Sequence, residues 1–154
     1  MIAAMGLSAY LGLFIVSFGA ATVLPLQSET ILVGLILSGE FSLAGLLLVA
    51  SAGNVLGAVC NWGLGRCIER FRDRPWFPAN ASSLERAGKW YRRYGRWSLL
   101  FSWMPIFGDA LTVLAGTLRE PLWSFLLLVA VAKTGRYLAL AAATLGSQAV
   151  IGLL

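Results

Sequence analysis

Long uncharged stretches alternate with short polar ones along the chain, and this pattern predicts helices that cross a membrane. No Asp, Glu, Lys or Arg occurs in residues 1–28, 30–39, 41–65, 97–108, 110–118, 121–132 or 137–154. A helix needs about 20 apolar residues to cross the hydrocarbon core. The stretch 42–65 exceeds that length and ends at Arg66, so we expect it to cross the membrane once. The stretch 122–154 predicts a second long helix, whose only charges are Lys133 and Arg136.

Two of the apolar regions contain a proline that is followed four residues later by an acid. Pro25 precedes Glu29 in the sequence LPLQSE, and Pro105 precedes Asp109 in MPIFGD. Proline has no N–H and its ring clashes with the preceding turn, so we expect a helix break at each proline. The run that follows Glu29, residues 31–39, is too short to span a membrane as a helix. We therefore predict a re-entrant hairpin around Pro25 that opens to the outside.

The two halves of the chain share these features in one register. Three matches recur at an offset of 80 residues: Pro25 with Pro105, Glu29 with Asp109, and LLLVA at 46–50 with LLLVA at 126–130. We expect one membrane domain made of repeat 1 (12–65), a loop (66–96) and repeat 2 (97–154). If each repeat is a hairpin followed by one span, the second begins on the opposite side of the membrane, which is an inverted-topology repeat. Residues 97–118 fit either a second hairpin or one kinked span.

The composition agrees with an all-α integral membrane protein. The chain is 58% hydrophobic and 12% charged, with a mean hydropathy of +0.78. A cleaved signal peptide is the other interpretation of the N-terminal stretch, but the first basic residue is Arg66 and the apolar run is too long. Cys60 and Cys67 lie seven residues apart on one expected helix, beyond disulfide reach. The chain contains no histidine, so we predict no metal site and no cofactor.

Basic residues gather in the loop 66–96, which holds nine of the twelve Lys and Arg residues against three acids. By the positive-inside rule this loop is expected to be cytoplasmic. Ser82 and Glu85 have capping-box spacing, so a helix is predicted to begin there. Arg86, Lys89, Arg93 and Arg96 are the basic residues expected to lie beside its apolar face. We expect this helix to lie on the membrane surface, with Trp90, Tyr91, Tyr94 and Trp97 at headgroup depth. It would act either as a topology anchor or as a lipid headgroup site.

Four charged residues fall within the predicted membrane region: Glu29, Asp109, Lys133 and Arg136. Each costs about 2.5 to 3.5 kcal/mol at the bilayer centre, so we expect them to face the protein interior. In one interpretation the acids pair with the cations and hold helices together. In the other, Lys133 and Arg136 attract an anionic group such as a phosphate in a water-filled cavity, while Glu29 and Asp109 couple transport to protons.

An intramembrane enzyme is the competing class, and the sequence argues against it. There is no histidine, and no serine forms an evident dyad with Lys133. Ser98 and Ser102 precede Pro105, but we expect their hydroxyls to bond to the helix backbone. A membrane assembly or envelope-homeostasis factor without a transported substrate is the remaining alternative.

Nearly the whole chain resembles the DedA family, also called the VTT or SNARE-associated family, and most closely its short YqaA-like branch. The resemblance is carried by LPLQSETILVGLILSG, GNVLGAVCNWGLGR, RYG, SWMPIFGDALTVLAG and KTGRYLALAAAT, in the expected order. It implies a bacterial inner-membrane protein with two opposed re-entrant hairpins. Characterised members are linked to moving undecaprenyl phosphate or phosphatidylethanolamine across the membrane in dependence on the proton-motive force.

The chain departs from the better-studied branch at three positions. That branch has arginines flanking the proline of the second hairpin, where this chain has Trp103 and Gly108, and Gln27 stands where a second proline is usual. Phosphate binding therefore cannot be transferred to those positions, and Lys133 and Arg136 would have to supply the positive charge.

Together with what the resemblance implies, these observations predict a multi-pass inner-membrane transporter of a phospholipid or of undecaprenyl phosphate that can couple to protons. Its expected partners are membrane lipids and protons, with no nucleic acid, and the sequence leaves a homo-oligomer open.

Overall fold

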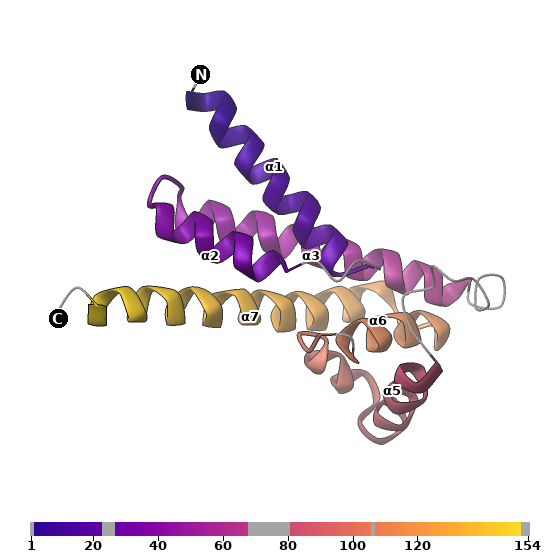
Figure 1. Cartoon of the computed structure of the whole chain (residues 1–154). Helices are drawn as coiled ribbons and strands as arrows, with labels where there is room; N and C mark the ends of the chain where they lie inside the picture. Colours follow the sequence, from indigo (N-terminus) through magenta and orange to yellow (C-terminus); the bar gives the residue numbers. More distant parts are fainter. Residues whose placement is uncertain (1, 23–26, 68–80, 106, 152–154) are drawn as a thin grey trace.

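The computed structural model describes residues 2–22, 27–67, 81–105 and 107–151, and every regular element among them is helical (Figure 1). The elements in chain order are α1 (Ile2–Ala20), α2 (Ser28–Ser38), α3 (Leu43–Arg66), α5 (Ala81–Tyr94), the 3₁₀ helix η1 (Gly95–Phe101), α6 (Phe107–Thr117) and α7 (Leu122–Ile151). The predicted break at Pro25 lies outside the described residues. The all-helical prediction is confirmed for the described part of the chain.

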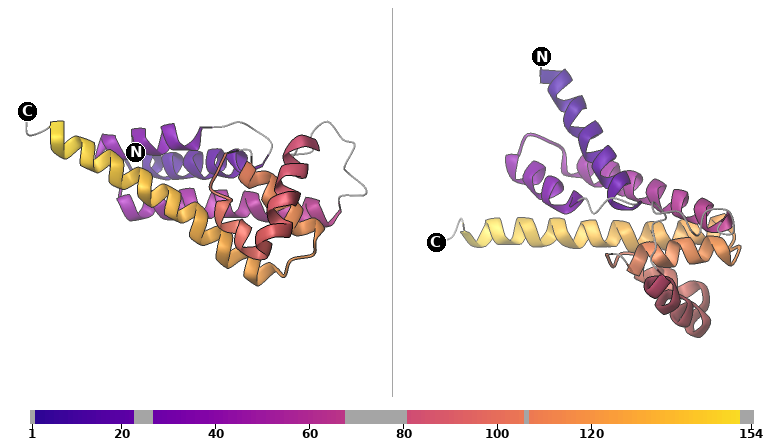
Figure 2. Two further views of the ribbon diagram at one scale, coloured as in Figure 1. Left: turned by 90° about the horizontal axis from the view of Figure 1, so that it is seen from below. Right: turned by 45° about the vertical axis from the view of Figure 1, so that its right-hand side comes forward.

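The two longest helices, α3 and α7, run in opposite directions through the molecule (Figures 1 and 2). Within the described residues they are the two helices that are long and apolar enough to cross a membrane. Their outward faces expose large apolar side chains, including Leu48 at 71% and Leu127 at 65%. Such faces suit contact with lipid. At the end of α3 the Arg66 guanidinium stacks on the Trp62 ring at 4.4 Å, a pairing suited to a membrane boundary.

The helical path is interrupted in both halves. In the first half α1 ends at Ala20 and α2 begins at Ser28. In the second half the chain turns at residues 102–105, where the Gly108 N–H donates to the Met104 carbonyl at 2.8 Å. The break at Pro105 is thus confirmed, while the re-entrant placement of either break in a bilayer stays a prediction. The short helices α2 and α6 have 11 residues each and are too short to span.

The two short helices end alike. Gly39 follows α2 with φ of 68°, and its N–H donates to the Ile36 carbonyl at 3.2 Å. Arg119 follows α6 with φ of 57°, and its N–H donates to the Gly116 carbonyl at 3.0 Å. Gly39 and Arg119 lie 80 residues apart, as do the acceptors Ile36 and Gly116, and this is the offset that the prolines and acids share. Left-handed backbone is typical of helix C-termini and suits glycine. Gly39 therefore adopts this conformation without strain, whereas Arg119 is strained in it.

Small residues allow helices to approach α3 closely on both sides. A Cβ atom on Gly53 or Gly57 would lie 2.6 Å from a carbonyl oxygen of α1. A Cβ on Gly65 would lie 1.9 Å from the Val113 carbonyl oxygen of α6, and one on Gly116 would lie 1.9 Å from the Trp62 carbonyl oxygen. Glycines in α3 thus let the backbones of neighbouring helices touch.

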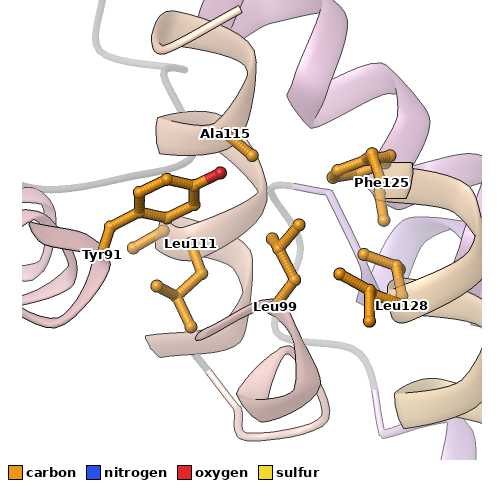
Figure 3. Close-up of a cluster of buried hydrophobic side chains, with 9 residues drawn as sticks. Tyr91, Leu99, Leu111, Ala115, Phe125 and Leu128 are labelled. Atoms are coloured by element: carbon orange, nitrogen blue, oxygen red, sulfur yellow. The ribbon is translucent and has the colours of Figure 1, made fainter. Parts of the chain in front are cut away.

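Two clusters of buried apolar side chains hold the helices together. The first joins α1, α2, α3 and α7 through Leu13, Leu32, Leu46, Ala50 and Tyr137. The second joins α3, α5, η1, α6 and α7, and Figure 3 shows its side chains Tyr91, Leu99, Leu111, Ala115, Phe125 and Leu128. In addition α3 packs along α6, and α7 packs along α2. Each long helix therefore contacts the short helix of the other half, which brings the two breaks together.

Candidate functional site

The four predicted intramembrane charges meet in one place and form two ion pairs. Arg136 pairs with Glu29, and the Lys133 Nζ lies 3.7 Å from the Asp109 Oδ1. Both cations belong to α7, three residues apart, so they share one face of that helix. The acids lie in the first turns of α2 and α6. In Figure 1 these two helices extend in opposite directions from the centre of the molecule. The site therefore forms where the N-termini of the two short helices approach one stretch of α7.

The pair on α6 is the more enclosed one. Lys133 is only 5% exposed, and the side chain of Asp109 is 18% exposed. The Lys133 ammonium also donates to the Oδ1 atom of Asn54 on α3. A buried ammonium is stable only when its charge is compensated and its donors find acceptors. Asp109 and Asn54 together meet this demand, so α3 completes the site.

The pair on α2 is more open. The side chains of Arg136 and Glu29 are 30% and 29% exposed. The Arg136 guanidinium also donates from Nη1 to the Trp103 carbonyl oxygen at 2.9 Å. Because Arg136 also pairs with Glu29, this bond links the first turn of α2, through Arg136, to the turn that precedes α6. An anion that approached from outside would therefore meet Arg136 before it met Lys133.

A chain of neutral hydrogen-bonding side chains runs from Lys133 to the first turn of α2. Asn54 Nδ2 donates to the Tyr137 hydroxyl at 2.9 Å, and that hydroxyl lies 3.0 Å from the Ser28 Oγ. Because Tyr137 accepts from Asn54, its own hydrogen is free to point at Ser28. Lys133, Asn54 and Tyr137 then donate in a single direction that ends at Ser28, the neighbour of Glu29 in the sequence. The arrangement makes Asn54 and Tyr137 part of the site.

Sequence reasoning missed Asn54 and Tyr137. A signal was present for each, because an asparagine inside a long apolar helix needs a polar partner and Tyr137 directly follows Arg136. Only the fold shows that residues 83 positions apart share a hydrogen bond.

A second polar contact links the two breaks. Asn61 on α3 donates from Nδ2 to the Ala21 carbonyl at 2.7 Å and to the Thr112 Oγ1 at 3.2 Å. Thr112 in turn donates to the Asp109 carbonyl at 2.7 Å. The end of α1 is thereby tied to the first turn of α6, so Asn61 helps to fix where Asp109 lies.

Several buried polar atoms have no hydrogen-bond partner within the described residues: Ser17 Oγ, Ser51 Oγ, Asn61 Oδ1 and Ser102 Oγ. Ser102 was expected to bond to the backbone, and that prediction is wrong, because the 3₁₀ turn before Pro105 places its hydroxyl away from an acceptor. Ser98 behaves as expected and donates to the Gly95 carbonyl at 2.8 Å. Buried polar groups are normally satisfied by protein or by water, and these four atoms lie on α1, on α3 and in the turn before α6.

The cysteines and acids form no metal site in the part of the chain that the structure describes. Cys60 and Cys67 are both free and exposed, in agreement with their predicted separation. No group of three His, Cys, Asp or Glu side chains comes together there.

The helix α5 begins at Ala81, one residue before the expected cap at Ser82, whose side chain lies outside the described ones. Of its predicted basic residues, Arg86, Lys89 and Arg93 are exposed on α5, while Arg96 belongs to η1 and lies 3.8 Å from a carboxylate oxygen of Glu120.

Tyr91 was expected among the aromatic residues at headgroup depth, but its ring faces the interior of the protein, and its depth in a bilayer stays a prediction. Its ring is only 9% exposed and packs in the second apolar cluster (Figure 3). Its hydroxyl donates to the Glu120 Oε2 at 2.8 Å, which satisfies the polar group and makes burial tolerable. Burial, and next the bond to Glu120, raise the pKa of Tyr91 above its usual 10.0. Glu120 therefore fastens α5 to the turn before α7.

Comparison with known proteins identifies relatives over most of the chain. The VTT domain family matches residues 14–146. Inner membrane protein YqaA of Escherichia coli (strain K12) is 42% identical over 134 residues, which cover 86% of this chain and 88% of that protein, and the YqaA of Shigella flexneri matches equally. An uncharacterized protein of Haemophilus influenzae is 38% identical over 135 residues, covering 83% of this chain and 82% of that protein. No solved structure matches the chain significantly.

The matched region includes both breaks, all of α3, most of α7 and all four charged residues of the site. Together with the extended identity to an inner membrane protein, it shows that the chain belongs to the VTT-domain family of membrane proteins, the DedA family.

Proposed function

We propose that this protein moves a phosphate-bearing lipid, a phospholipid or undecaprenyl phosphate, across the bacterial inner membrane. The observation that carries the proposal is the convergence of Glu29 and Asp109, one from each broken region, on two cations of α7. Paired charges in a membrane are expensive and usually mark a pathway for ions or substrates. The inner-membrane assignment rests on the name of the Escherichia coli relative and on the two apolar helices. The loop 66–96 would then be cytoplasmic.

The matching ends of α2 and α6 support an inverted repeat. Pro25 and Pro105, Gly39 and Arg119, and the two acids all agree at one offset. The crossed packing of α3 on α6 and of α7 on α2 is the arrangement expected of two related halves that face one another. In this proposal each short helix is one arm of a re-entrant hairpin, and its N-terminal dipole faces the membrane midplane.

Arg136 is the residue that would meet the lipid phosphate first. Its guanidinium bonds to the backbone of Trp103, one of the two places at which the family resemblance led us to look for an arginine. A side chain from α7 could thus supply a charge that this chain lacks at that position of the turn. Guanidinium groups bind phosphate through two parallel hydrogen bonds, which favours Arg136 over Lys133 as the direct contact.

Phosphate binding would release the acids from their cations. A carboxylate that loses its cation in a poorly hydrated site tends to take up a proton. Of the two acids Asp109 is the more enclosed, so transfer of the phosphate towards Lys133 would be linked to protonation at Asp109. This exchange gives a physical route for the protonmotive force to act on the site.

A lipid flip-flop assay tests the proposal. Purified protein is reconstituted into liposomes that contain a fluorescent phospholipid or polyprenyl phosphate, and a membrane-impermeant quencher reports the lipid that reaches the outer leaflet. We expect faster flip-flop with a pH gradient, reduced at least tenfold by Glu29→Gln or Asp109→Asn. Glu40→Gln is the matched control, because Glu40 is exposed and outside the site. Unchanged flip-flop for all lipids, with or without the gradient, would refute the proposal.

The second candidate is a membrane assembly factor without a transported substrate. The pairing of all four charges favours this candidate, because ion pairs between helices can hold the helices together without any role in transport. In that case neutral substitutions would lower the abundance of the folded protein and leave no separate functional defect.

A further inference from the structure

We propose that α5 carries a binding site for the phosphate headgroup of an anionic phospholipid, separate from the four-charge site. A pocket on this helix is lined by Lys89, Trp90, Arg93 and Tyr94. Its volume is about 190 Å³. Pockets for whole drug-sized ligands start at roughly 300 Å³, so this one has the size for a headgroup and not for an entire lipid.

The pocket consists of two rows of side chains on adjacent faces of α5. The cations Lys89 and Arg93 are four residues apart, and so are the aromatic residues Trp90 and Tyr94. The two rings lie 5.1 Å apart, and the Arg93 guanidinium lies 5.6 Å from the Tyr94 ring centroid. A cationic row beside an aromatic row provides charge for a phosphate and an apolar surface for the glycerol and first acyl carbons.

The aromatic row continues beyond α5. Trp90 contacts Phe101 of η1 and Phe107 of α6, with ring centroids 5.2 Å and 5.9 Å apart. Phe107 is the first residue of α6 and precedes Asp109 by two residues. The pocket therefore adjoins the helix that carries the enclosed acid, although the proposal stands without any transport.

The surface that forms the pocket is held in place. Tyr91 lies on the opposite, buried side of α5 and donates to Glu120, and the adjacent Arg96 lies near the same carboxylate. These contacts fasten α5 to the turn before α7. The pocket is thus preorganised, which lowers the ordering cost of binding a ligand.

The acid beside the pocket is Glu85, whose Oε1 lies 3.1 Å from the Lys89 Nζ. Both side chains are largely exposed, at 70% and 66%. Exposed pairs of this kind contribute little, so a phosphate can compete with Glu85 for Lys89.

Exposed aromatic residues indicate that the occupant is a lipid and not an acidic protein segment. In the pocket Trp90 and Tyr94 are 39% and 46% exposed, and Trp97 and Trp103, which follow α5 in the chain, are 64% and 44% exposed. Tryptophan and tyrosine gather at the membrane–water boundary, which is the depth of lipid phosphates. Cations close to an anionic surface at this depth are attracted to it.

Quenching of tryptophan fluorescence by brominated lipids tests the site in the full-length protein. The protein is reconstituted in phosphatidylcholine vesicles that contain a small fraction of brominated phosphatidylglycerol or brominated phosphatidylcholine, and the Trp90 component is the difference between wild type and Trp90→Phe. We expect phosphatidylglycerol to quench this component preferentially. Arg93→Gln should reduce the preference about tenfold more than Arg92→Gln, which removes the same charge from the neighbouring position outside the pocket.

Two further variants distinguish a specific headgroup site from general electrostatic attraction of α5 to an anionic membrane. Arg93→Lys keeps the charge but loses the paired hydrogen bonds, so it should lose part of the preference. Glu85→Gln removes the carboxylate that competes for Lys89, so it should raise the preference for phosphatidylglycerol. Equal quenching by both lipids would overturn the proposal and leave the pocket as a contact for an acidic protein. Equal losses in the Arg92 and Arg93 variants would overturn it in favour of unspecific surface attraction.

Discussion

Replacing Lys133 by methionine should be the most informative single change in the site. The substitution keeps the length of the side chain, removes its charge and leaves Asp109 without its cation. Lys133 is 5% exposed, so solvent offers little compensation. Breaking a buried pair by removing one partner costs about 3 to 5 kcal/mol. We therefore expect Lys133→Met to destabilise the protein by about that amount in detergent.

The double variant Asp109→Asn/Lys133→Met removes the unpaired charge as well. Asparagine fits the space of aspartate, so stability should return to within about 1 to 2 kcal/mol of wild type. The same cycle on Glu29 and Arg136 should give smaller penalties, because that pair is about 30% exposed and water can replace a lost partner. Thermal unfolding, followed by size-exclusion chromatography of heated samples, measures the stability of all variants.

Transport separates the two interpretations of the site. If the charges bind and move substrate, the double variant should be stable and still inactive in the flip-flop assay. If they only hold α6 against α7, the double variant should regain activity together with stability. A double variant as unstable as Lys133→Met would refute the pairing itself, and a stable and active one would refute the proposed role in transport.

Three other predictions concern packing, α5 and a backbone conformation. Gly116→Ala should destabilise the protein by about 1 to 3 kcal/mol in thermal unfolding, because its Cβ would meet the Trp62 carbonyl. Gly63→Ala is the control: its Cβ would meet nothing within 4 Å, so this change should be neutral or slightly stabilising. Tyr91→Phe should cost about 1.5 to 3 kcal/mol through the lost bond to Glu120. Because the pKa of Tyr91 is raised in the folded protein, the unfolded chain loses this proton first, so stability should fall as pH rises above about 10 in wild type and less so in Tyr91→Phe. Arg119→Gly should stabilise by up to about 1 kcal/mol by relieving the positive φ, and an unchanged or lower unfolding temperature would contradict that reasoning.

The sequence was sufficient to predict the elements that depend on local pattern. Apolar length predicts α3 and α7, and proline with its following acid predicts the interruption at residues 102–105. The cost of charge in a membrane predicts that Glu29, Asp109, Lys133 and Arg136 face inward. These predictions succeed because each rests on a strong constraint that the bilayer places on neighbouring residues.

The sequence was not sufficient where long-range packing decides. It left open which acid pairs with which cation, because α7 could have rotated or shifted by a turn against α2 and α6. It did not show that the Tyr91 ring is buried in the protein, because amphipathic spacing does not reveal that Glu120, 29 positions away, accepts a hydrogen bond from its hydroxyl. The uncharged stretch that contains Asn54 does not indicate that its side chain accepts a hydrogen bond from Lys133, 79 positions away. Polar contacts of this kind require the fold.

The symmetry of the two halves is incomplete at the site, and this affects how a transport cycle could work. The acids are duplicated at the offset of 80 residues, but the cations are not, because Gly53 and Leu56 of α3 occupy the places that correspond to Lys133 and Arg136 of α7. Exchange of the two halves therefore cannot recreate the site by itself. In the proposed function both cations stay with α7, and access alternates between the α2 acid, now about 30% exposed, and the more enclosed α6 acid. The asymmetry makes α7 the element whose movement against α2 and α6 would expose each acid in turn.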